Sequence, residues 1–408
     1  MRDTEFLSTV LGVKPPWRVV SADVDLAAET IEAHVVHEGA VTCRQCGAAA
    51  TRHDHRERRW RHLDLFQYRF YVVARVPRIE CRDHGVQQLG VPWAEDRSRF
   101  TQLFEGLTIG LLHEMSIAAV ARRLRLSWDE VDGIMARAVV RGLQRRAKRQ
   151  LRFIGIDEKA VKKRHHYFTI VSDLETSTVI WVGRGRKRET LDRFWANLST
   201  EERAGIEGIA MDMWPAYFES TLAAVPQAER KIVFDKFHIV KHLVHAVDLT
   251  RRAEVRQSGE DGTALKRTRY TWLRRHGSMT QGEKLHFAAL RHQYRRVARA
   301  WELKELFAHL WDYRYDGAAR TFFRAWYLSA IHSGLRHVKT VAKMIKSHFE
   351  NVLTYLRIPI TNAPSESINS KIQLIKARAR GFRSEARFAS AILFHCGGLS
   401  LFPSHTSS

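Results

Sequence analysis

The sequence predicts a protein of several domains: an α/β core that is interrupted by an all-α insertion and preceded by two small domains. Three observations support this. With 408 residues, the chain is too long for one ordinary domain. Short β-like runs such as 68–73 occur in the first 95 residues, residues from about 98 to 148 have a helical pattern, and from Leu151 the pattern changes to apolar runs typical of buried strands. A helical stretch rich in Trp, Arg and Leu then separates these strands from a last helix near Asn362.

The charge balance indicates a polyanionic partner. The chain has 67 Lys and Arg against 44 Asp and Glu, a formal net charge of +23, and the basic residues run through its whole length. Nucleic acid is the first candidate; a ribosomal or membrane-surface protein is the alternative. No apolar stretch reaches the roughly 20 residues that span a bilayer, and the N-terminus does not resemble a signal peptide. We therefore expect no membrane partner, a cytoplasmic location and reduced cysteines.

Two pairs of metal-binding residues predict a small zinc finger. Each pair is spaced by two residues, the pairs are 34 residues apart, and a glycine follows each. Such pairs close a tetrahedral site around one structural Zn²⁺. The expected ligands are Cys43, Cys46, Cys81 and His84. The alternatives are four unrelated residues, or ligation by one of the histidines between the pairs, which are His53, His55 and His62. Cys396 is expected to be a core thiol.

A helix-turn-helix is predicted next. Residues 116–124 and a second helix from Trp128 are joined by a tight turn, and Ser127 with Glu130 forms a capping box. The second helix would lie in a DNA groove. An ordinary helical hairpin is the alternative. The basic residues expected to contact DNA here are Arg122, Arg123, Arg137 and Arg141.

The α/β core has the strand order of an RNase H-like fold. Five apolar, β-branched runs precede the helical stretch, and a helix is expected at 191–198 between the third and the fourth. Three early strands followed by alternating helix and strand is the order of that fold. The five expected strands are 153–157, 166–172, 177–182, 208–212 and 231–235.

Three acids in this core are the candidate catalytic residues. Asp157 and Asp212 are expected to close two strands, and Glu366 lies at the start of the last helix, which Asn362 should cap. Carboxylates brought together repel one another and bind divalent metal, here two Mg²⁺ or Mn²⁺ ions. His238 and Asn369 are expected near this site. The acids that remain alternatives are Glu158, Asp173 and Asp235.

At these residues the sequence resembles a bacterial insertion-sequence transposase of the DDE type, closest to the ISL-three family. The resemblance covers nearly the whole chain, through the finger and segments 155–158, 211–217, 234–238, 361–372 and 376–383. It implies that Asp157, Asp212 and Glu366 form the catalytic triad and that the protein works at bacterial nucleoid DNA. One departure is Ala363-Pro364, where the family has an Asn-Gly pair. Further DNA-contacting residues expected in the last helix and tail are Lys371, Lys376, Arg380 and Arg383.

The resemblance implies a Mg²⁺-dependent enzyme that binds the terminal inverted repeats of an insertion sequence and cleaves and transfers strands. The alternative is a DNA-binding regulator with an inactive core, but none of the three acids is missing. We expect double-stranded DNA, at the element ends and the target, as partner, and a homodimer. One tryptophan of the insertion is expected to contact DNA: Trp272, Trp301, Trp311 or Trp326. Packing in the core of a helical bundle is the alternative for each of them. The expected domains are 1–95, zinc finger; 96–150, helix-turn-helix; 151–244, first part of the core; 245–355, helical insertion; and 356–408, last helix and tail.

Overall fold

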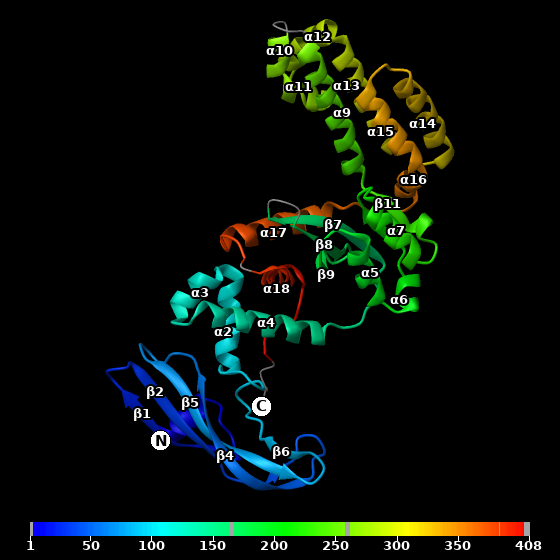
Figure 1. The fold of residues 1–408 in the computed structure, drawn as a ribbon. Coiled ribbons are helices and arrows are strands. Elements are labelled where there is room, and N and C mark those ends of the chain that lie inside the picture. The colour runs from blue at the N-terminus through cyan, green and yellow to red at the C-terminus, as the bar shows by residue number, and fades with distance from the viewer. Residues whose placement is uncertain (1–2, 163–165, 258–261, 383, 404–408) are drawn as a thin grey trace. The chain divides into compact units, whose positions relative to one another are not determined.

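The chain forms two compact units in the computed structural model, which describes residues 3–162, 166–257, 262–382 and 384–403 (Figure 1). The first unit comprises 1–147, 377–395 and 399–408, and the second comprises 148–376 and 396–398. Each unit has a hydrophobic cluster of its own. None of the described helices is long and apolar enough to cross a membrane.

The first unit is built on a six-stranded sheet of order β1-β2-β5-β4-β3, with β6 paired to β5. Alternate side chains of β2 are buried, and they pack with Trp17, Trp60 and Phe70 into one core. Residues 3–37, which lie within the expected finger domain 1–95, contribute a helix and two strands to this unit. Its elements are α1 (Asp3–Val10), β1 (Trp17–Asp25), β2 (Thr30–His37), β3 (Val41–Thr42), β4 (Ala49–Arg61), β5 (Arg69–Cys81) and β6 (Gly85–Gln88).

Four helices complete the first unit: α2 (Gln102–Glu114), α3 (Ile117–Leu124), α4 (Trp128–Arg145) and most of α18 (Glu385–Cys396). The predicted capping box of Ser127 and Glu130 is present at the start of α4.

The C-terminal tail packs on α4. Arg387 donates to Asp129 at 2.7 Å, and Arg145 donates to the carbonyl oxygen of Phe402 at 2.6 Å. Gly142 leaves room for Leu399, whose Cβ would lie 2.7 Å from a Cβ at that position. The tail, which the sequence analysis grouped with the core, thus belongs to the first unit.

The second unit contains a five-stranded sheet of order β11-β10-β7-β8-β9. β7, β8 and β9 are antiparallel, and β10 and β11 add in parallel on the other side of β7. All five predicted strands are confirmed. They are β7 (Phe153–Lys162), β8 (His166–Asp173), β9 (Thr178–Arg184), β10 (Gly208–Met211) and β11 (Ile232–Phe234). The helices among them are α5 (Arg188–Ala196), α6 (Thr200–Ala204), α7 (Pro215–Ala224) and α8 (Ala228–Lys231).

One strand end was predicted wrongly. Asp157 was expected to close the first strand, but β7 continues to Lys162, because its hairpin with β8 pairs as far as Lys162 and His166. What ends beside Asp157 is the pairing with β10, whose last register pair is Met211 with Ile156.

The described part of residues 236–357 is helical, as predicted. The predicted border at 244/245 falls inside the long helix α9, so no loop separates it from the sheet. The elements are α9 (Lys236–Gln257), α10 (Gly262–Arg267), α11 (Arg269–Leu273), α12 (Gln281–Gln293), α13 (Arg295–Ala308), α14 (Asp316–Ile331), α15 (Arg336–Ser347) and α16 (Phe349–Arg357), with 3₁₀ turns at His276–Ser278 and His309–Asp312. Helix α17 (Ala363–Arg378) follows.

Candidate active site and zinc centre

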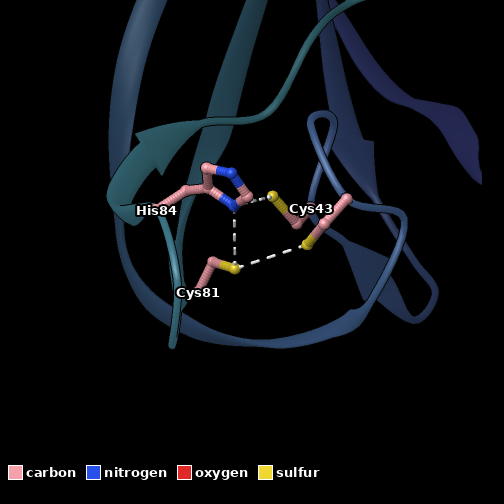
Figure 2. A group of neighbouring side chains, drawn as sticks. Cys43, Cys81 and His84 are labelled. Atoms are coloured by element: carbon pink, nitrogen blue, oxygen red, sulfur yellow. Dashed lines mark hydrogen bonds between the residues drawn. The ribbon is translucent and has the colours of Figure 1, made fainter.

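The four predicted zinc ligands come together in the first unit. Their ligand atoms all lie within 4.8 Å of one another. Sγ of Cys46 is 3.7 Å from Sγ of Cys81, and Nδ1 of His84 is 3.6 Å from Sγ of both Cys43 and Cys81 (Figure 2). Tetrahedral Zn–S bonds of about 2.3 Å place two sulfurs about 3.8 Å apart, so the spacing suits zinc.

The backbone of each knuckle prepares the sulfurs for metal. Gly47 and Gly85 have φ angles of 73° and 64°, which glycine adopts without strain. Backbone N–H groups of Cys46 and Gln45 lower the pKa of the Cys43 thiol to about 6, although its partial burial opposes this. The thiolate is the form that binds zinc, so this environment favours ligation.

The rival histidines lie elsewhere in the first unit. His62 is buried, with Nδ1 2.9 Å from Oγ1 of Thr101, and His53 lies 3.6 Å from Asp54. Among the described residues, no histidine between the knuckles belongs to a group of side chains close enough together to bind a metal ion. The predicted ligand set is therefore supported over its alternatives.

Two of the four arginines that were predicted to contact DNA are exposed on the helix-turn-helix. Arg122 and Arg123 are exposed at the end of α3. The DNA contact predicted for Arg141 is wrong. Its side chain is 6% exposed and donates hydrogen bonds to Glu95 at 2.6 Å and to Glu105 at 2.7 Å. The guanidinium is therefore not available to a phosphate. Arg137 also bonds to Glu105, at 2.6 Å, and is partly exposed.

Asp157 and Asp212 lie side by side in the second unit. Ile156 and Met211 are register partners on parallel strands, so the aspartates that directly follow them, Asp157 and Asp212, occupy neighbouring positions. Each accepts a 2.7 Å bond at Oδ1 from the next backbone N–H, of Glu158 and Met213 respectively. Burial raises the pKa of Asp157, and the nearby charge of Asp212 acts in the same direction.

Helix α17 begins close against β7. A Cβ on Gly155 would lie 2.6 Å from Oγ of Ser365 and 2.8 Å from Oδ1 of Asn362, so only glycine permits this approach. One face of α17 thereby meets the strand that carries Asp157. The Asn362 side chain does not make the predicted cap: both its polar side-chain atoms are buried without a partner among the described residues.

Asn369 connects α17 directly to Asp157. Its Nδ2 donates a 2.6 Å bond to Oδ2 of Asp157, while its Oδ1 is buried and has no partner in the described part of the chain. Glu366 is exposed one helical turn before Asn369. Residues three apart share a helix face, so Glu366 is carried on the side of α17 that serves Asp157.

His238 faces Asp212 from the first turn of α9. Its Nδ1 lies 3.5 Å from Oδ1 of Asp212, which is an ion-pair distance, not a well-formed hydrogen bond. This contact raises the pKa of His238. Burial acts to raise the pKa of Asp212, but the contact with His238 outweighs it and lowers that pKa. His238 thus lies beside Asp212, one of the two predicted catalytic aspartates.

Family models match all three parts of the chain. A model described as "Transposase" matches residues 154–392, the helix-turn-helix domain of transposase family ISL3 matches 91–139, and the zinc-finger of transposase IS204/IS1001/IS1096/IS1165 matches 39–84. The chain belongs to the ISL3 transposase family. Like the other members of that family, it is a DNA-binding transposase.

Two curated relatives support the ISL3 assignment over most of the chain. The transposase for insertion sequence element IS1001 of Bordetella parapertussis is 30% identical over 85% of this chain and 86% of its own length. The transposase for IS1557 of Mycobacterium tuberculosis is 28% identical over 99% of this chain and 98% of its own. The zinc-finger match includes all four metal ligands, and the transposase match includes Asp157, Asp212 and Glu366.

The three alternative acids make different contacts in this ISL3 transposase. Asp173 lies at the far end of the β7–β8 hairpin, where it pairs with Arg149 and accepts backbone bonds from the turn. Glu158 lies 3.3 Å from Arg186. Asp235 is 1% exposed, and its Oδ1 accepts the N–H of Phe237 at the start of α9.

Sequence reasoning missed Lys159. It lies two residues after Asp157 on β7, hence on the same face of the strand, and its Nζ donates to the carbonyl of Asn369 at 3.2 Å. Burial lowers its pKa. The period of two along the strand was the signal that could have found it.

The remaining predicted basic residues are placed as follows. On α17, Lys371 is exposed and Lys376 half-buried; Arg380 is exposed in the tail, and Arg383 lies outside the described residues. Three of the four tryptophans of which one was expected to contact DNA have the alternative role of bundle core. Trp272, Trp301 and Trp326 are at most 4% exposed in the core of the helical segment, and only Trp311 is half-buried.

Proposed function

We propose that Asp157, Asp212 and Glu366 form the catalytic centre of this transposase, on an RNase H-like core with 236–357 as its helical insertion. Three antiparallel strands followed by two parallel ones, with acids beside the central pair, support that fold. The observation that carries the proposal is the bond from Asn369 to Asp157, since it joins the helix of Glu366 to the paired aspartates.

The donor set fits Mg²⁺. Two carboxylates at the end of the β7–β10 pairing offer the oxygen ligands that this ion prefers, together with Oδ1 of Asn369, which has no partner among the described residues. Asp157, Asp212 and Glu366 would hold two ions. When bound, such ions activate the attacking hydroxyl and stabilise the leaving oxygen of a phosphodiester. Asn369 would hold Asp157 in one orientation, and His238 would do the same for Asp212.

The N-terminal modules would read DNA. We infer that the zinc finger and helix-turn-helix bind the terminal inverted repeats, with Arg122 and Arg123 on phosphates, and that Lys371 and Lys376 contact DNA near the acids. Two ends must be brought together for transposition, so we propose a homodimer on DNA. The domain borders expected from the sequence stay part of this proposal, with two exceptions: the insertion begins with α9 at Lys236, and the tail belongs with the first unit.

The test is cleavage of a labelled element end in Mg²⁺ or Mn²⁺. Asp157→Asn, Asp212→Asn and Glu366→Gln should each abolish cleavage and leave binding to the same DNA nearly unchanged. Glu175→Gln, which removes an exposed charge near the far end of the β7–β8 hairpin, is the matched control and should cut normally. A variant that cleaves at the wild-type rate would remove that acid from the centre.

The same assay separates the enzyme from a DNA-binding regulator. A wild-type chain that binds the repeats but cuts with neither metal, even with both ends supplied, would favour the regulator.

A further inference from the structure

The outer face of α15 is a cationic groove in the helical segment. Arg336 and Lys343 are exposed and Lys339 is half-buried, and with Gly334 and Thr340 they line a groove of about 380 Å³. The opposite face of α15 is buried through Val338, Val341, Ala342 and Ile345. The helix is therefore anchored by its apolar side and presents three positive charges on the other.

No acid in the helical hairpin of α14 and α15 balances those charges. Residues 316–347 contain six Lys and Arg but one acid, Asp316, which is paired with Arg357 of α16. Arg336, Lys339 and Lys343 have no ion-pair partner among the described residues. The first turn of α15 is also free of acids, although negative charge is favoured at that end of a helix. Three unpaired cations in one groove repel one another, and an anionic ligand would relieve that repulsion.

The groove is connected to the catalytic centre through α9. This helix starts with His238 beside Asp212 and continues through half-buried His242 to exposed His245. Helix α15, which carries the groove, packs against α9. The seven residues from His238 to His245 rise about 10 Å along α9, which equals the rise of about three nucleotides along one DNA strand.

We propose that the α15 groove, Arg336, Lys339 and Lys343, binds the phosphate backbone of duplex DNA a few nucleotides from the strand break. This rests on the proposed catalytic centre. Exposed cations in a row suit phosphates, which repeat along the strand, and no base-reading side chain is needed. The insertion thus contacts DNA through this helix face, and its buried tryptophans hold the helices in place.

The test compares two triple variants of the full chain on one labelled element end. Arg336→Gln/Lys339→Gln/Lys343→Gln removes the groove charges. Lys266→Gln/Arg267→Gln/Arg295→Gln removes three exposed charges elsewhere in the helical segment. Each phosphate that is no longer neutralised lowers the slope of log affinity against log salt by about 0.9. For the groove variant, the slope of log affinity against log salt should be smaller than that of the wild type by up to about 2.7. Over a fourfold rise in salt concentration, the wild type should then lose about 40-fold more affinity than the variant. The control should keep the wild-type slope.

A charge-preserving variant, Arg336→Lys/Lys339→Arg/Lys343→Arg, should restore the slope and thereby exclude a folding defect. Equal slopes for groove and control variants, with wild-type cleavage in both, would overturn the groove while leaving the catalytic centre intact. An altered oligomeric state with unchanged DNA binding would also overturn it, because the groove would then meet an acidic protein surface. Failure of the wild type to cut would instead count against the proposed function, since the salt slope is measured without cleavage.

Discussion

Asn369 donates a 2.6 Å hydrogen bond from its side-chain nitrogen to Oδ2 of Asp157, across 212 residues of sequence. The bond joins α17, which carries Glu366, to β7, which carries the first aspartate. Its other side-chain atom, Oδ1, is buried without a described partner. Asn369 is therefore placed to fix the orientation of Asp157 and the position of the helix at once.

Asn369→Ala should lower the cleavage rate about 10- to 100-fold, the usual loss when a group that orients a metal ligand is removed. It should also raise the Mg²⁺ concentration needed for half-maximal cleavage. Gln373→Ala, exposed one turn later on α17, is the control and should cut like the wild type. A rate for Asn369→Ala within twofold of the control, at all metal concentrations, would show that Asp157 needs no such support.

Cys43→Ser should release one zinc per chain and loosen the β4–β5 end of the first unit. Loss of one of four ligands opens the site, and structural zinc contributes directly to folding. Metal analysis of purified protein measures it. Cys396→Ser is the matched control: this thiol is buried, its pKa is raised to about 11, and it lies outside the cluster, so zinc should stay bound. Retention of a full zinc by Cys43→Ser would mean that other residues bind it.

Substitution of Arg141 should lower stability, whereas substitution of the α3 arginines should weaken DNA binding. Arg141→Met should lower stability, because Glu105, 1% exposed, loses one of its two arginines. The loss should stay below the about 3–5 kcal/mol of a fully broken buried pair, since Arg137 remains bonded to Glu105. Arg122→Gln/Arg123→Gln should leave stability unchanged and lower the salt slope of DNA binding by about 0.9 for each phosphate that is no longer neutralised. Thermal unfolding and salt-dependent binding measure the two effects. A reduced salt slope in folded Arg141→Met would restore Arg141 as a DNA-binding residue.

The contrast between these arginines marks what the sequence could predict. Spacing alone was enough for the zinc ligands, since four residues in two short pairs can meet in few ways. The strands were predictable because each is a short apolar run of the length and composition of a buried strand. Arg141 was misplaced because its partners, Glu95 and Glu105, come from other segments and leave no local signal.

Long-range pairing explains the other errors. Asp157 was expected at a strand end because the apolar run stops there, yet β8 continues the hairpin with polar residues. The tail was grouped with the core by sequence order, whereas Leu399 and Leu401 pack on α4. Asn369 was predicted near the site from its helix position, but its bond to Asp157 depends on packing that only Gly155 permits.

His62 should make the first unit sensitive to acid. Burial lowers the pKa of His62 to about 4, whereas the unfolded chain has about 6.5. The unfolded state then binds more protons, so the stabilisation is complete above pH 6.5 and is lost as the pH falls toward 4. The loss is at most about 1.4 kcal/mol per pH unit. His62→Asn should flatten this dependence, measured by hydrogen exchange of β5 amides in excess zinc; parallel profiles for both proteins would contradict it.

Gly155→Ala should uncouple the two halves of the catalytic centre without unfolding the chain. The added Cβ would lie 2.6 Å from Oγ of Ser365 and 2.8 Å from Oδ1 of Asn362, so α17 must shift away from β7. The Asn369 bond then lengthens and Glu366 moves with its helix, so cleavage should fall at least as far as in Asn369→Ala.

Gly110→Ala is the matched control for this substitution. Nothing lies within 4 Å of a Cβ there, and alanine in a helix is favoured over glycine, so stability should be unchanged or higher by about 0.4–1 kcal/mol. Adding Ser365→Gly to Gly155→Ala removes the shortest contact and should recover part of the cleavage rate. Full activity of Gly155→Ala alone would mean that the spacing between β7 and α17 does not limit catalysis. An inactive variant that also loses its specific DNA binding would instead indicate general unfolding, because the finger and helix-turn-helix lie in the other unit.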